Sequence, residues 1–95
     1  MRHVDQKKQT QSFQLLTNVY LVKKSREAYE QARSMVENGH PHADKLCKER
    51  ASTCYSCAER IQETEDMVSK RMKEICRLNG HLCIELIQVL ESKPD

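Results

Sequence analysis

The chain has 95 residues, of which 38% are hydrophobic and 32% charged, with one Phe and no Trp. This length predicts one small domain, spanning residues 1–95. Few bulky side chains, together with only two Gly and two Pro, are typical of long packed helices and argue against a sheet protein. The net charge of +2 is nearly balanced, so we expect no specific nucleic-acid partner.

The residues from Met1 to Thr10 are polar, and no run approaches the ~18 apolar residues of a membrane span. We therefore expect neither a signal peptide nor a spanning helix, and a cytoplasmic location. The five cysteines, at positions 47, 54, 57, 76 and 83, follow the helical repeat. Thiols packing as small hydrophobic side chains in a reducing compartment explain that spacing most simply.

A first helix is predicted at about residues 12–38. Leu15, Val22, Tyr29 and Val36 recur every seven residues, which is the pattern of an amphipathic helix. A turn is predicted at residues 38–44, because Gly39 suits a helix C-terminus and Pro41 disfavours helix in the residue before it. A connection this short makes the flanking helices antiparallel.

A second helix is predicted at about residues 44–91, or ~70 Å if it is unbroken. Small or apolar residues recur along it with alternating steps of three and four residues, which is the pattern of a coiled-coil seam, and only Glu65 and Asn79 are polar. The seam positions are Cys47, Ala51, Cys54, Ala58, Ile61, Glu65, Val68, Met72, Ile75, Asn79, Leu82, Leu86 and Val89. Because this spacing stays in phase across Asn79-Gly80, we expect the helix to continue there. The predicted fold is an all-α antiparallel long-helix hairpin, a coiled coil completed as a bundle by dimerisation.

The end of the second helix is apolar around most of its circumference, and pairing across the hairpin leaves residues beyond about Arg77 without an in-chain partner. A third helix or another chain must then bury the remainder. We expect a homo-oligomer, in the simplest case a dimer. The predicted interface residues are Ile61, Val68, Met72, Ile75, Asn79, Leu82, Leu86 and Val89.

Cys54 and Cys57 form a Cys-x-x-Cys pair, which in other contexts binds metal or performs redox chemistry. Here the pair lies within a predicted helix, with no strand before it and no second copy, so structural packing is the favoured interpretation and metal or redox chemistry the alternative. No nucleophile, base and orienting group assemble at a plausible spacing. We therefore predict a protein that is not an enzyme and needs no cofactor or metal.

Basic residues cluster locally, which suits an anionic membrane surface or an acidic partner. An ordinary salt-bridged surface is the favoured interpretation, because acidic residues are interspersed. The candidate contacts are Lys23, Lys24, Arg26, Lys70, Arg71 and Lys73.

The run from Lys23 to Arg33, KKSREAYEQAR, resembles the Lys-x-x-Tyr-x-x-Ala style of helix in F-BAR domains, which are membrane-curving helical dimers. The stretch from Lys45 to Leu90 is similar to their following helix, whereas the family's leading helix and aromatic anchors are missing. The resemblance is thus to a truncated core, and it implies phospholipid contacts at the six basic residues named above.

These patterns together predict a non-enzymatic coiled-coil module for interaction and dimerisation, a scaffold of the F-BAR type peripheral at membranes. The alternative is an antiparallel coiled-coil finger that binds a small GTPase or another helical partner. A cysteine-based metal or redox protein ranks last.

Overall fold

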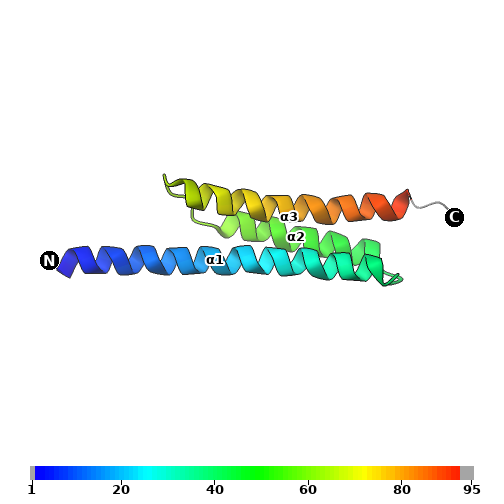
Figure 1. Ribbon diagram of the computed structural model, residues 1–95, viewed down its shortest axis with the longest axis horizontal. Helices are drawn as coiled ribbons and strands as arrows, with labels where there is room; N and C mark the ends of the chain where they lie inside the picture. Colours follow the sequence, from blue (N-terminus) through cyan, green and yellow to red (C-terminus); the bar gives the residue numbers. More distant parts are fainter. Residues whose placement is uncertain (1, 93–95) are drawn as a thin grey trace.

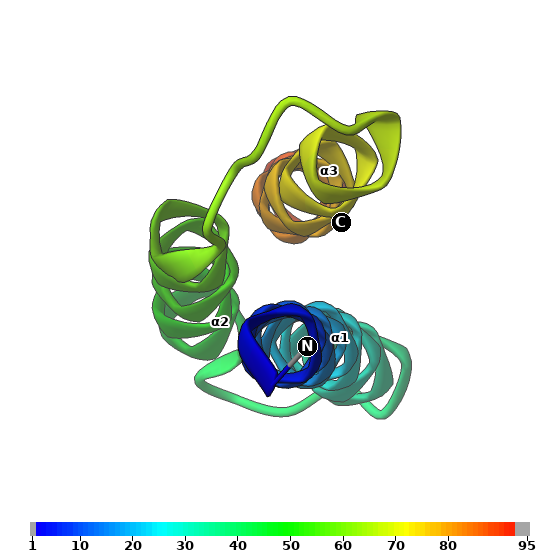
Figure 2. The ribbon, with the colours of Figure 1, turned by 90° about the vertical axis from the view of Figure 1, so that its left-hand side faces the viewer.

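The computed structural model describes the backbone of residues 2–92 and the side chains of residues 13–92. It contains three helices: α1 (Arg2–Glu37), α2 (Ala43–Arg60) and α3 (Met67–Glu91). In Figure 1, α2 runs back along α1, and α3 turns again to run in the direction of α1. Seen from the end, the three helices stand at the corners of a triangle (Figure 2). The all-α prediction is confirmed, and the architecture is a three-helix arrangement.

The first helix begins earlier than predicted. The polar segment before residue 12 belongs to α1, which starts at Arg2. The physical reason lies in the backbone, because the segment holds neither Gly nor Pro and contains several good helix formers. As a result, α1 projects beyond the ends of α2 and α3 at its amino-terminal end (Figure 1).

The turn between α1 and α2 lies where the sequence predicts it. Gly39 adopts a positive φ of 67°, in the left-handed region that favours glycine. The amide of the next residue, His40, donates to the Met35 carbonyl at 2.9 Å, which satisfies an end group of α1. The glycine therefore both ends α1 and starts the reversal into α2.

The prediction of a single long second helix is wrong. Helix α2 ends at Arg60, Ile61 takes an extended conformation, and α3 starts after Asp66. The Asp66 carboxylate accepts from the Ser69 amide at 2.8 Å and so caps α3. Hydrogen bonds from the Thr64 hydroxyl and from backbone amides hold the pKa of Asp66 below its ordinary value.

A side chain of α1 completes this break. The Asn18 amide donates to the Gln62 carbonyl and accepts from the Gln62 amide, both at 3.3 Å, and Asn18 is buried. It thereby satisfies backbone groups that leaving the helix releases. Glu65, predicted to lie in the seam, is exposed in this loop.

The reason for the break is the apolar tail. Folding back at residues 61–66 lays α3 against both α1 and α2, with Cys76 and Cys83 fully buried and Ile87 6% exposed. The prediction that residues beyond Arg77 lack a partner within the chain is therefore wrong. Removing this apolar surface from water offsets the helical hydrogen bonds lost at the break.

The core consists mainly of small side chains. One cluster joins the three helices near the turn at Gly39, and its buried members are Ala28, Ala32, Cys47, Ala51, Cys54, Cys83 and Ile87. The other cluster lies nearer the break at residues 61–66, and its buried members are Leu21, Cys57, Ala58, Ile61 and Cys76. Helix α3 continues through Asn79-Gly80, as predicted. A Cβ on Gly80 would lie 2.8 Å from the Tyr55 ring, so the glycine permits close packing of α2 on α3.

Candidate interaction surface

Helix α3 has two faces of different composition. Its inner face, which packs into the bundle, consists of Ser69, Cys76, Asn79, Gly80, Cys83 and Ile87. A second set follows alternating steps of three and four residues on another side of the helix, and we call it the outer stripe: Val68, Arg71, Ile75, Leu78, Leu82, Glu85 and Val89. Such spacing is that of a coiled-coil seam.

The apolar members of the outer stripe are largely open to solvent. Val68 is 54% exposed, Leu78 56% and Val89 57%, and Ile75 is 42% exposed. Leu82 is half-buried. Contacts with α1 and α2 thus cover the inner face and leave these apolar side chains of the outer stripe uncovered.

Contacts on either side of α3 locate the outer stripe. The Tyr55 ring of α2 meets the edge of the His81 ring, with 5.6 Å between ring centroids, so this flank of α3 faces α2. On the other flank, Met72 packs with Val22 of α1 against the cluster nearer the break. Helical periodicity puts the outer stripe beyond Met72, on the side of α3 away from α2.

The predicted interface residues divide between the core and the surface. Ile61 and Asn79 are buried within the chain, where the Asn79 amide donates to the Ser25 hydroxyl at 3.0 Å. Met72, Leu82 and Leu86 are half-buried, whereas Val68, Ile75 and Val89 are exposed. Sequence reasoning missed Leu78 and Glu85, and it named Arg71 only as a candidate lipid or acidic-partner contact; the same three-four spacing, started from Val68, finds all three.

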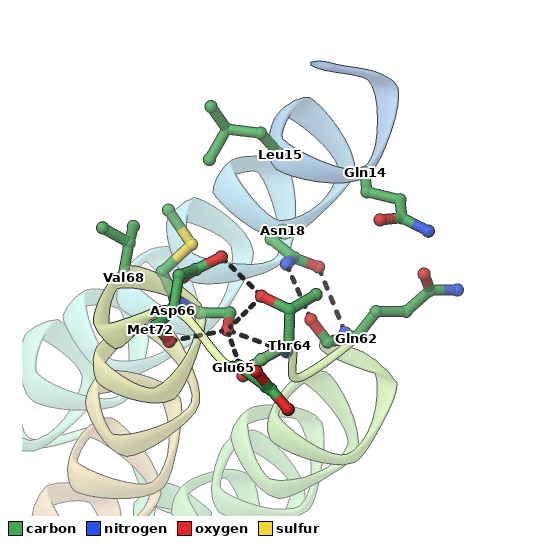
Figure 3. Close-up of a pocket in the computed structure, with 10 residues that line it drawn as sticks. Gln14, Leu15, Asn18, Gln62, Thr64, Glu65, Asp66, Val68 and Met72 are labelled. Carbon is green, nitrogen blue, oxygen red and sulfur yellow. Dashed lines mark hydrogen bonds between the residues drawn. The ribbon is translucent and has the colours of Figure 1, made fainter. Parts of the chain in front are cut away.

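A pocket of about 530 Å³ opens between α1 and the start of α3 (Figure 3). Leu15 and Val68 contribute apolar walls, and the loop contributes Thr64, Glu65 and Asp66. The Thr64 hydroxyl donates to the Asp66 carboxylate, and its amide donates to the Ser69 hydroxyl at 3.0 Å. Thr64, Asp66 and Ser69 thus bond one another, and the apolar wall of the pocket continues the outer stripe at Val68.

The part of α1 that precedes the core also exposes large apolar side chains. Phe13 is 73% exposed, and the others are Leu15, Leu16, Val19 and Tyr20. Phe13, Leu16 and Tyr20 follow steps of three and four residues, and Leu15 and Val19 lie beside them, so the five side chains share about half of the circumference of α1.

Cys54 and Cys57 do not form a shared site. They belong to different core clusters, and the Cys54 thiol donates to the Ser25 carbonyl at 3.2 Å. All five cysteines are free and buried, which confirms that they pack as small hydrophobic side chains. Within the side chains that the structure describes, no group of three or more His, Cys, Asp or Glu residues could hold a metal ion.

The thiols also have unequal acidity. Burial raises the pKa of Cys47, Cys57 and Cys76. The contact between Cys54 and Cys83, together with burial, raises the pKa of Cys54, and the same contact lowers the pKa of Cys83. Cys83 is nevertheless 0% exposed, so even this thiol lacks the access that a reactive nucleophile requires.

The predicted lipid contacts lie on two helices. Lys23, Lys24 and Arg26 of α1 are exposed, and so are Lys70 and Arg71 of α3. Lys73 is half-buried and pairs with Glu63 at 3.8 Å, while Arg26 pairs with Glu30 at 3.1 Å. Lys24 lines a shallow pocket with residues of α2, so the α1 cations point to different sides of that helix. Across residues 2–92, no helix combines the length and hydropathy needed to cross a membrane.

Comparison with protein-family models, with curated proteins and with solved structures found no match for this chain. The resemblance to F-BAR domains therefore stays a prediction.

Proposed function

We propose that the protein is a non-enzymatic helical interaction module that associates with a second copy of itself through the outer stripe of α3. The observation that carries this proposal is the exposure of Val68, Ile75, Leu78 and Val89 after the chain has closed its own core. The inner face of α3 is occupied by α1 and α2, and the outer stripe has the three-four spacing with which one helix packs on another.

The stripe suits a reversible dimer. Full burial of an aliphatic side chain contributes about 1.5–3 kcal/mol, and the four residues are already about half-buried, so each has roughly half of that left to contribute. Four side chains from each copy, eight in all, together contribute about 6–12 kcal/mol. Association itself costs at least about 4 kcal/mol, so the upper part of this range corresponds to a dissociation constant on the order of 10 µM. The dimer thus forms at micromolar concentrations rather than being obligate.

Sedimentation velocity across about 1–200 µM protein tests this function. The wild type is expected to shift from monomer to dimer, and the double variant Ile75→Gln/Leu78→Gln to stay monomeric. Glu74→Gln/Arg77→Gln, with two exposed changes on the same helix off the stripe, is the matched control and should dimerise like the wild type. A wild type that remains monomeric at 200 µM contradicts the proposal.

Sedimentation of the wild type and a lipid-binding assay also test the alternative functions predicted from the sequence. A monomeric wild type would favour the alternative function, in which the chain binds a small GTPase or another helical partner. Lipid binding of the F-BAR kind is tested by cosedimentation with phosphatidylserine vesicles. If lipid recruits the chain, Lys23→Gln/Lys24→Gln should reduce the bound fraction.

A further inference from the structure

We infer that the second copy lies antiparallel on the outer stripe, with a two-fold axis beside Leu78 that pairs Arg71 of each copy with Glu85 of the other. This inference rests on the proposed self-association and specifies its geometry. The interface is then isologous, so that each contact occurs twice.

The apolar residues of the stripe are arranged symmetrically about Leu78. Ile75 and Leu82 flank it on either side, and Val68 and Val89 stand at the two ends. When two copies of the helix run in opposite directions about this point, Ile75 comes level with Leu82 of the other copy to within about one residue, a rise of ~1.5 Å. Val68 comes level with Val89 in the same way, so apolar residues meet along the whole stripe.

The charged residues of the stripe are complementary under the same symmetry. Arg71 and Glu85 are each seven residues from Leu78, in opposite directions. The antiparallel arrangement therefore places the guanidinium of one copy level with the carboxylate of the other, twice per dimer. Both side chains are exposed, and neither has an ion-pair partner among the described side chains of its own chain.

The parallel arrangement lacks this complementarity. It would place Arg71 beside Arg71 and Glu85 beside Glu85, and like charges opposite one another destabilise a helical pair. Opposed helix dipoles also favour antiparallel neighbours. Charge thus selects the orientation, while the apolar residues supply the association.

Charge exchange tests this orientation by sedimentation at low ionic strength. In the antiparallel dimer, Arg71→Glu or Glu85→Arg creates two repulsive contacts, so each variant should raise the dissociation constant about tenfold. The double variant Arg71→Glu/Glu85→Arg restores both pairs with reversed sign and should return within about twofold of the wild type. Lys70→Glu, an exposed change of the same charge next to the stripe, is the matched control and should have little effect.

The results distinguish failure of the geometry from failure of the function. Wild-type dimerisation with no loss in the single variants, or without rescue in the double variant, would overturn the antiparallel pairing while leaving self-association intact. A monomeric wild type would instead overturn the proposed function itself.

Added cysteines give an independent measurement of the same geometry. Leu78→Cys should form a disulfide-linked dimer under mild oxidation with oxidised glutathione, because the axis brings the two new thiols together. Val68→Cys and Val89→Cys should each link poorly alone but link to one another when mixed, which contradicts a parallel pairing. Efficient self-linking of Val68→Cys would overturn the inference, and the wild type, whose five thiols are buried, controls for other crosslinks.

Discussion

The inner face and the outer stripe of α3 differ in a way that reverses the usual relation between size and burial. The inner face buries Cys76, Gly80 and Cys83, whereas the outer stripe exposes Val68, Ile75 and Leu78. Small side chains let α1 and α2 approach α3 closely, as the contact of Gly80 with the Tyr55 ring illustrates. The comparison teaches that close fit selects the inner face of this helix, and hydrophobicity alone does not.

The two faces also differ in how they use polar groups. On the inner face, the Asn79 amide donates to the Ser25 hydroxyl, which in turn donates to the Val22 carbonyl at 2.8 Å. On the outer stripe, Arg71 and Glu85 remain exposed to solvent. Buried polar groups thus fix the packing inside the chain, and exposed charges are left available to a partner.

Enlarging the inner face should have the largest effect. Cys83→Leu adds volume at a residue with 0% exposure, so we expect the free energy of unfolding to fall by about 3 kcal/mol. Urea denaturation followed by circular dichroism measures the loss. Arg77→Leu on the exposed part of α3 should change it by less than about 0.5 kcal/mol; equal losses in the two variants would contradict the close fit of the inner face.

Removing the buried amide should have the next largest effect. Asn79→Ala deletes the hydrogen bond to Ser25 and leaves a small cavity, so the free energy of unfolding should fall by about 2 kcal/mol. The coupling to Ser25→Ala in a double-mutant cycle should be clearly non-zero. Gln88→Ala, an exposed amide on the same helix, serves as the control, and additive effects of Ser25→Ala and Asn79→Ala would show that the pair does not interact.

Removing the cap of α3 should have a smaller and pH-dependent effect. Because the pKa of Asp66 is lowered from its ordinary value of 3.8, the carboxylate stabilises the fold above that value, and this stabilisation is lost as the pH falls through the folded-state pKa. Asp66→Ala should therefore lower the urea midpoint at pH 6, and the difference from the wild type should disappear near pH 2. A difference that is unchanged at low pH would show that the charge contributes nothing.

Truncating the outer stripe should have the smallest effect on the monomer. Leu78→Ala removes a side chain that is 56% exposed, so the free energy of unfolding at about 1 µM protein should change by less than about 0.5 kcal/mol. At about 100 µM the wild type should gain stability from association, and the variant should gain less. A large loss at 1 µM would place Leu78 in the intrachain core and remove the distinction between the two faces.

The helical class of the chain and the first turn could be predicted from local sequence. Gly39 is the only glycine before α2, and Asn38 and Pro41 nearby reinforce the reversal. Continuity through Gly80 followed from the phase of the surrounding apolar residues. These features depend on residues close in sequence, whose conformational preferences do not require tertiary contacts.

The break at residues 61–66 could not be found in the same way. It contains neither Gly nor Pro, and its residues continue a plausible heptad from Ile61 to Val68. Asp66 is a residue type that can cap a helix, but Asp also occurs at many positions where no helix begins. The hydrogen bonds that complete the break come from Asn18, which is far away in sequence. The gain from burying Cys76, Cys83 and Ile87 against two other helices arises only when the chain folds back.

By itself, the sequence determined that this protein is helical, that it turns at Gly39 and that α3 carries more apolar residues than one neighbour can cover. Only the tertiary structure decided which of them face inward. Helical spacing supports both Val68-Ile75-Leu82-Val89 and Ser69-Cys76-Cys83 as seams, one residue apart. The second set is buried because its smaller side chains let three helices meet closely, which is a property of the packed helices together and of no single segment.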